Sequence, residues 1–139
     1  MSFTALAGLL LGCSRMTSDE LKARVFDAAV RVVKFVEALP NVPRTWTVGK
    51  QLLDSGTSQA AQYRAACRAQ STRDFISKMK RMEEEADESA FWLAVLRTTE
   101  LPAGLTREGA DLEREFSELT AIAVSSVKTA RLRLKPRQR

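Results

Sequence analysis

The sequence has no histidine and only two cysteines among its 139 residues. Without histidine it has no Ser–His–Asp or Cys–His nucleophilic site, no His-ligated zinc and no Glu-x-x-His di-iron site. Two cysteines are too few for an all-cysteine zinc site or a disulfide framework. The six glycines form neither GxGxxG nor a GxxxxGK phosphate-binding loop. We therefore expect a protein that is not an enzyme and needs no cofactor.

The composition predicts one soluble domain. Apolar residues make up 45% of the chain and charged residues 28%, which favours a folded globule over a disordered chain. A chain of this length can bury one sizeable core. We expect the core in residues 17–134, an N-terminal extension in residues 1–16 and a basic tail in residues 135–139. We expect no membrane span and a cytoplasmic location.

The N-terminal extension allows two interpretations. The segment Leu10-Leu11-Gly12-Cys13 resembles a lipoprotein cleavage box, in which Cys13 would be lipidated. However, no basic residue precedes the apolar run, and the run is too short to span a bilayer. The favoured interpretation is an upstream or non-native extension, with Met16 near the natural start.

Basic residues gather at the C-terminal end. The last twelve residues carry six cations and no acid, whereas the whole chain has a formal net charge of +5, so residues 1–127 are close to neutral. Such a segment can bind RNA or DNA by releasing counterions. The alternative is a frayed, solubilising helix end, and no aromatic residue here indicates base stacking. The candidate nucleic-acid contacts of this segment are Lys128, Arg131, Arg133, Lys135, Arg137 and Arg139.

Apolar residues recur at helical spacing in four segments, which predicts helices over residues 18–39, 45–69, 72–99 and 106–134. Thr17 with Glu20 forms a capping box before the first, and Ser71 with Asp74 resembles an N-cap pair before the third. Prolines mark the turns after the first and third helices. Four long helices with short connections predict an all-α, antiparallel up-down-up-down four-helix bundle.

Each helix has an expected buried face. In the second helix this face is made of small residues, which would let a neighbouring helix approach closely. In the third, Phe91 and Trp92 widen the apolar face, and this excess could bury against a neighbouring subunit. The expected buried residues are Leu21, Val25, Ala28, Val32, Val36 and Leu39; Gly56, Ala60, Ala61, Ala65, Ala66 and Cys67; Phe75, Met79, Met82, Ala86, Ala90, Leu93 and Leu96; and Leu112, Phe116, Leu119, Ala123, Ser126 and Ala130.

Charged residues are densest in the third helix. Lys80 lies one turn from Glu84, and Arg81 one turn from Glu85, which predicts ordinary solvated ion pairs. A metal site would need Glu84, Asp87 and Glu88, but one helix cannot supply a full ligand cage, so we expect no metal. The candidate ion-pair or interface residues of this helix are Lys78, Glu84, Glu85, Asp87, Glu88 and Trp92.

Arg64, Arg68 and Arg73 surround the turn between the second and third helices. Arg64 and Arg68 share one helix face, so they are candidate phosphate contacts. Pairing with acids of a neighbouring helix or subunit is the favoured alternative for them, because Glu83, Glu84 and Asp87 of the third helix are candidate partners. Pairs between helices would fix register. Cys67 is expected to be a buried, inert thiol.

The segments 53–71, 75–78 and 84–93 together resemble the 23S rRNA intervening-sequence protein family, also called the bacterial four-helix bundle protein family. The resemblance extends over about residues 25–134. The family usually has asparagine at the position of Gln62, before Tyr63 and Arg64. The residues that match recurrent family positions are Arg64, Arg68, Lys78, Glu84, Glu85, Asp87, Glu88 and Trp92.

This resemblance implies an antiparallel four-helix bundle that forms a ring-like homopentamer. It also implies a fold similar to accessory proteins of diversity-generating retroelements, which bind nucleic acid. No catalytic residue is implied. We therefore expect a non-enzymatic oligomeric scaffold or adaptor that binds protein partners and RNA or another nucleic acid. The alternative is a purely structural protein-interaction bundle with no nucleic-acid role.

Overall fold

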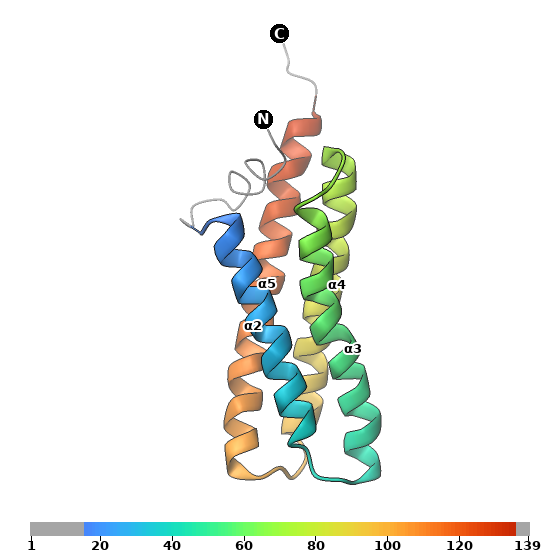
Figure 1. Ribbon diagram of the computed structural model, residues 1–139, viewed down its shortest axis with the longest axis vertical. Coiled ribbons are helices and arrows are strands. Elements are labelled where there is room, and N and C mark those ends of the chain that lie inside the picture. The colour runs from blue at the N-terminus through green and yellow to red at the C-terminus, as the bar shows by residue number, and fades with distance from the viewer. Residues whose placement is uncertain (1–15, 136–139) are drawn as a thin grey trace.

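The computed structural model describes residues 16–135, which form four helices joined by short turns (Figure 1). The described residues contain no strand. The helices are α2 (Ser18–Glu37), α3 (Pro43–Ala66), α4 (Thr72–Arg97) and α5 (Ala103–Leu134). The prediction of an all-α fold with four helices is confirmed. Among the described residues, no helix combines the length and the apolar character that a membrane crossing requires.

Capping side chains and prolines mark where the helices begin. Thr17 and Glu20 form the expected capping box, with the Thr17 hydroxyl accepting from the Glu20 amide at 3.1 Å. The Ser71 hydroxyl likewise accepts from the Asp74 amide at 3.0 Å. The second and fourth helices begin earlier than predicted. Proline needs no hydrogen bond in the first turn, so Pro43 opens α3 and Pro102 directly precedes α5.

The four helices lie along a common long axis (Figure 1). The start of α2, the turn between α3 and α4 and the end of α5 lie at one end of the bundle, which we call the terminal end. The turns between α2 and α3 and between α4 and α5 lie at the other, which we call the loop end. α2 packs more extensively on α3 than on α5.

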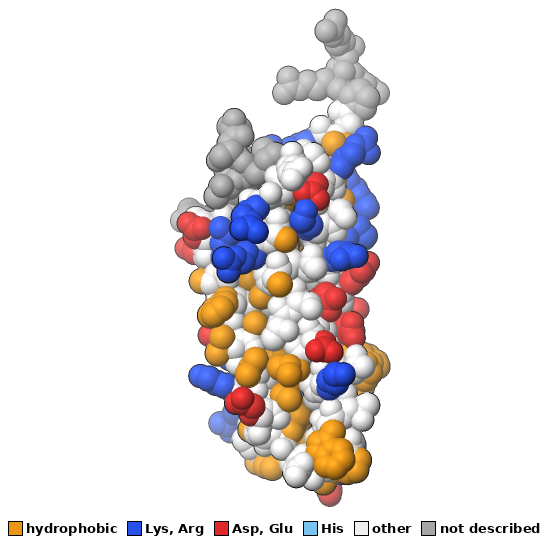
Figure 2. All heavy atoms as spheres, turned by 45° about the vertical axis from the view of Figure 1, so that its right-hand side comes forward, with side chains coloured by type: hydrophobic (Ala, Val, Ile, Leu, Met, Phe, Trp, Pro, Cys, Tyr) orange, Lys and Arg blue, Asp and Glu red, His pale blue; other side chains and the backbone are white. Residues whose placement is uncertain are grey.

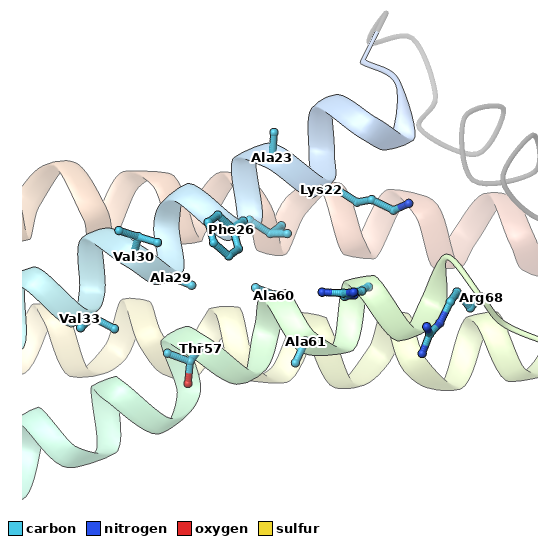
Figure 3. A pocket seen from close by; sticks show the side chains of 12 residues that line it. Lys22, Ala23, Phe26, Ala29, Val30, Val33, Thr57, Ala60, Ala61 and Arg68 are labelled. Carbon is cyan, nitrogen blue, oxygen red and sulfur yellow. The ribbon is translucent and has the colours of Figure 1, made fainter.

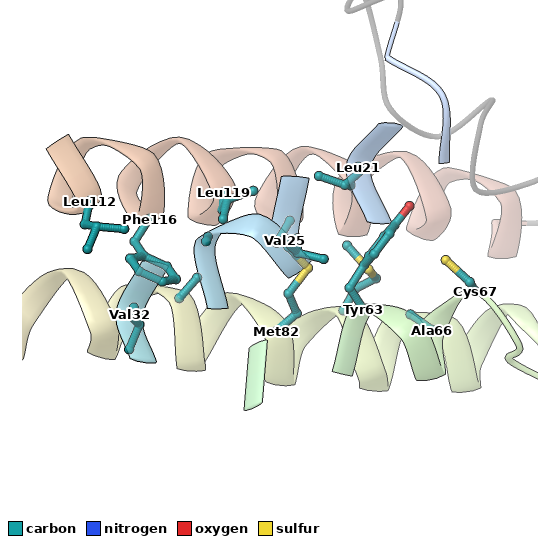
Figure 4. Packing of buried hydrophobic residues seen from close by; sticks show 14 of the residues in the cluster. Leu21, Val25, Val32, Tyr63, Ala66, Cys67, Met82, Leu112, Phe116 and Leu119 are labelled. Atoms are coloured by element: carbon teal, nitrogen blue, oxygen red, sulfur yellow. The ribbon is translucent and has the colours of Figure 1, made fainter. Parts of the chain in front are cut away.

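The core runs along the bundle interior, where the large side chains of all four helices meet (Figure 4). The predicted stripes of α4 and α5 are buried at nearly every position. In α4, Ser89 rather than Ala90 is buried inside the bundle, where its hydroxyl donates to the Ser55 hydroxyl at 2.9 Å. In α2, Phe35 is buried and Val36 is not. The Phe35 ring fits beside Gly109 of α5, where a Cβ would lie 3.4 Å from the ring.

The prediction for the inner face of α3 is wrong in part. Gly56, Ala66 and Cys67 are buried as expected, but Ala61 is exposed and Ala60 and Ala65 are only half-buried. The inner side chains of α3 are larger and more polar: Leu52, Ser55, Gln59 and Tyr63. These residues recur at three- and four-residue spacing, and they turn the alanines toward the outside of the bundle.

Close packing joins α2 to α3. A Cβ on Gly56 would come within 2.9 Å of both methyl groups of Val32, so only glycine fits there without a shift. One turn further along α3, the Gln59 amide nitrogen donates to the Val25 carbonyl at 2.9 Å and to the Gly56 carbonyl at 3.2 Å. This contact fixes the register of α2 on α3.

Candidate binding surface: an outer groove and a basic end

A groove runs along the outside of the bundle between α2 and α3 (Figure 3). Its volume is about 840 Å³, which is room for several side chains of a partner. The walls are mostly apolar, and Phe26 beside the groove is 68% exposed. The apolar and small residues that line it are Ala23, Val25, Phe26, Ala29, Val30, Val33, Thr57, Ala60 and Ala61.

Three cations line the same groove at the terminal end: Lys22 from α2, Arg64 from the last turn of α3 and Arg68 from the turn that follows it. Arg64 and Arg68 are exposed and have no carboxylate partner among residues 16–135. Lys22 lies 3.8 Å from the exposed carboxylate of Asp19. Within one chain, the prediction that these arginines pair with acids of α4 is therefore wrong, because they face the groove on the α2 side. Pairing with acids of a neighbouring subunit stays a prediction. The groove has an apolar part and a cationic end.

The terminal end of the bundle is rich in basic side chains. Arg64 and Arg68 lie there with Lys128, Arg131, Arg133 and Lys135 from the end of α5, and all six are exposed. No ion pair engages any of these six within the described part of the chain. Figure 2 shows Lys and Arg side chains crowding this end of one face, with apolar side chains gathering nearer the loop end. Two further candidates, Arg137 and Arg139, lie outside the described residues, as does Cys13.

The candidate charged residues of α4 fall into two groups. The first group, Lys78 and Glu85, is partly buried. Lys78 pairs with Asp74 at 2.5 Å, and this cation lowers the pKa of that carboxyl. Lys80 lies nearest to Glu83, at 3.9 Å, rather than to the predicted Glu84. The pKa of the Glu85 carboxyl is raised, first by partial burial and then by its acidic neighbours.

The second group faces outward from the bundle. Glu84, Asp87 and Glu88 are exposed, and among the described residues Glu84 and Asp87 have no cationic partner. Glu88 accepts a hydrogen bond from the Trp92 indole at 3.0 Å. Trp92 is half-buried and packs against the core, whereas Phe91 is 57% exposed with its ring edge-on to Trp92.

Ion pairs that the sequence did not reveal join α2 to α5. Arg24 contacts Glu115 at 2.5 Å and also contacts Glu118, while Arg31 contacts Glu108 at 2.9 Å. The hydrogen bond with Glu115 is the main cause that raises the pKa of Arg24. These partners lie more than seventy residues apart in sequence, so no local spacing could indicate them.

The remaining sequence candidates for reactive chemistry are the acidic clusters and Cys67. Within residues 16–135, no group of three or more acidic or cysteine side chains could hold a metal ion. Cys67 is buried, and this burial raises the pKa of its thiol. Because a thiol with a raised pKa is mostly protonated, Cys67 is a poor nucleophile.

No family model and no curated protein matches this chain. Among solved structures, the chain is similar to a protein with unknown function from the S23 ribosomal protein family of Bacteroides thetaiotaomicron VPI-5482, whose crystal structure was determined at 1.70 Å. The two chains share 32% identity with a TM-score of 0.69, and the match covers 78% of this chain and 98% of the other. The chain belongs to the S23 ribosomal protein family.

Membership in the S23 family confirms the family part of the sequence resemblance and the four-helix fold that it implied. The likeness to retroelement accessory proteins stays a prediction. The S23 relative has unknown function, so the binding surfaces of this chain have to be interpreted from their own chemistry. The groove was missed in the sequence because the alanines of α3 were assigned to the core. The sequence signal for the groove was Phe26, a large apolar residue that lies outside the predicted buried stripe of α2.

Proposed function

We propose that this S23-family protein is a non-enzymatic, oligomeric scaffold or adaptor in the cytoplasm that binds RNA or another nucleic acid. The observation that carries the proposal is the gathering of exposed, unpaired cations at the terminal end of the described bundle. They come from α3 and α5, which are far apart in sequence at this point. The proposal includes the antiparallel up-down-up-down arrangement and a ring-like homopentamer, which the family resemblance implies.

Phosphate binding by such a surface has a clear physical basis. Each arginine or lysine that contacts a phosphate releases a condensed counterion, and the entropy of that release drives association. Cations that already pair with a carboxylate contribute less, and Lys128, Arg131 and Arg133 have no such partner among residues 16–135. Within the described part of α5 no aromatic side chain is exposed, so we expect its cations to recognise the RNA backbone with little sequence preference.

The test is the salt dependence of RNA affinity. Fluorescence anisotropy with a labelled single-stranded RNA would compare the wild type with Lys128→Gln/Arg131→Gln/Arg133→Gln over a series of KCl concentrations. Each lost phosphate contact lowers the slope of log K against log salt by about 0.7, so the triple variant should lose about 2. The matched control is Lys34→Gln/Lys50→Gln/Arg107→Gln, which removes three exposed cations near the loop end.

The control should retain the wild-type slope. An equal loss of slope in both triple variants would mean that net charge alone attracts RNA, and it would contradict a site at the terminal end. Light scattering on a sizing column with absorbance at 260 and 280 nm would report mass and co-purifying nucleic acid together.

The apolar groove favours a second candidate function. A purely structural protein-interaction bundle would use the groove and have no nucleic-acid role. Its basic end would then be incidental. Absence of RNA binding at physiological salt, combined with a wild-type mass above 15.5 kDa, would support this alternative.

A further inference from the structure

The described bundle carries two outer surfaces of opposite charge, each with apolar residues beside its charged ones. The first is the groove between α2 and α3, with its apolar walls and its three cations. The second is an outward stripe of α4 made of Glu84, Asp87, Glu88 and Phe91, which we call the α4 stripe. At three- and four-residue spacing these side chains lie on one side of the helix, opposite the buried positions. A ridge of this kind can enter a groove between two helices.

We infer that the α4 stripe of one copy of this chain docks into the α2–α3 groove of a second copy. Lys22, Arg64 and Arg68 of the groove then face the acids of the stripe, and Phe91 contacts the apolar walls. This inference rests on the oligomer of the proposed function and names the two surfaces that meet in it.

The order of groups along the bundle supports this pairing. In the groove, the cations lie nearer the terminal end, and Val30 and Val33 lie nearer the loop end (Figure 3). In the α4 stripe, the acids also come nearer the terminal end, because α4 runs from that end toward the loop end and Phe91 follows them. Two copies with parallel long axes therefore match charge with opposite charge and apolar surface with apolar surface.

The exposed aromatics strengthen the case for a covered surface. Phe26 beside the groove and Phe91 on the stripe are 68% and 57% exposed within a single chain. Large aromatic side chains with this exposure are enriched at protein interfaces, where their burial stabilises the complex. Glu84 and Asp87 on the stripe, and Arg64 and Arg68 in the groove, are unpaired among residues 16–135 and so are available for partners.

The symmetry of the assembly follows from this pairing. The groove and the stripe are different surfaces of one chain, so the contact is heterologous. Each copy offers one groove and one stripe, and repetition of the contact closes a ring when the rotation between neighbours divides a full turn. An isologous dimer, in which both copies use the same surface, does not follow from this arrangement.

Charge reversal with restoration tests the pairing. The groove variant is Arg64→Glu/Arg68→Glu, and the stripe variant is Glu84→Arg/Asp87→Arg. Light scattering on a sizing column should show that each weakens association by about 100-fold or more, since like charges then oppose each other. The four-residue variant that combines both reversals restores opposite charges in every interface, so its mass should return to that of the wild type.

The control is Arg44→Glu/Lys50→Glu, which reverses two exposed cations near the loop end and should keep the wild-type mass. Far-ultraviolet circular dichroism checks that each variant remains helical. A wild type that is monomeric would contradict both the oligomer and this interface. An oligomeric wild type whose two charge-reversal variants keep their mass would overturn the interface alone. Dissociation of both variants without recovery in the combined variant would also overturn it.

Discussion

The α2–α3 layer has two apolar faces, and only the inner one is covered by the rest of the described chain. Val25 and Phe26 are neighbours in sequence, yet Val25 is 2% exposed in the core and Phe26 is 68% exposed beside the outer groove. On α3, the inner Gln59 is buried while the outer Ala61 is exposed. Both faces contain apolar residues, so hydrophobicity alone does not indicate which face is buried. The inner face builds the fold, and the outer face is available for association.

We expect the two faces to differ most in how much stability is lost when a phenylalanine is replaced by alanine. Phe116→Ala removes a fully buried ring and leaves a cavity, so it should lower the free energy of unfolding by about 3–5 kcal/mol. Phe26→Ala removes an exposed ring and should change it by no more than about 0.5 kcal/mol. Urea denaturation at concentrations where both variants are monomeric measures the two values. Equal losses would contradict the separation of inner and outer faces.

The second prediction concerns the close approach of α2 and α3. Gly56→Val places methyl groups where a Cβ alone would already lie 2.9 Å from Val32, so it should destabilise the fold by about 1–3 kcal/mol. The matched control is Gly104→Ala, at a helical glycine with open space around it. This control should gain up to about 1 kcal/mol from helix propensity. Denaturant midpoints compare the stability of the two variants with that of the wild type. A Gly56→Val variant as stable as the wild type would mean that α2 and α3 are not held this closely.

The third prediction concerns the side of α2 that faces α5, where ion pairs occur in addition to apolar packing. Arg24→Ala breaks the pairs with Glu115 and Glu118 and should cost about 1 kcal/mol, because the site is partly exposed. The difference from wild type should shrink as salt screens the pairs. Arg114→Ala, which breaks an exposed pair with Asp111, should have almost no effect. If the loss of stability caused by Arg24→Ala does not change with salt concentration, it comes from lost packing of the side chain and not from the ion pairs.

The smallest expected effect concerns Glu85, at the edge between the inner and outer faces of α4. Its pKa is raised in the folded state, so folding disfavours the ionised carboxyl. The free energy of unfolding should therefore increase as the pH falls through this raised pKa. Glu85→Gln should remove that increase and stabilise the protein near pH 7 by no more than about 0.5 kcal/mol. Denaturation between pH 3 and pH 7 tests the sign, and a wild type that loses more stability than the variant on acidification would contradict it.

Local chemistry made most of the fold predictable from the sequence. The spacing of Leu112, Phe116 and Leu119 identified the inner face of α5, and Thr17 with Glu20 identified the start of α2. The inner face of α3 was misassigned, because small residues occur on both of its sides and hydrophobicity alone does not choose between them. The face that is buried includes the polar residue Gln59, which a hydrophobicity pattern assigns to the surface.

The binding surfaces were only partly predictable. Arg64 and Arg68 were identified as candidates, but their position beside Phe26 depends on how α2 packs against α3. The same holds for Arg24 and Glu115, whose contact exists only in the folded bundle. Surfaces built from two helices follow from tertiary packing, which single-helix periodicity does not contain.

The most direct test of the account is the mass and helicity of Phe26→Asp, measured beside the wild type by light scattering and circular dichroism. We predict a wild-type mass that is a multiple of 15.5 kDa, and a variant that falls to a single chain while keeping its helical content. That result would show that the outer face serves association and not folding. A monomeric wild type, or a variant that loses its helices together with its mass, would contradict the account.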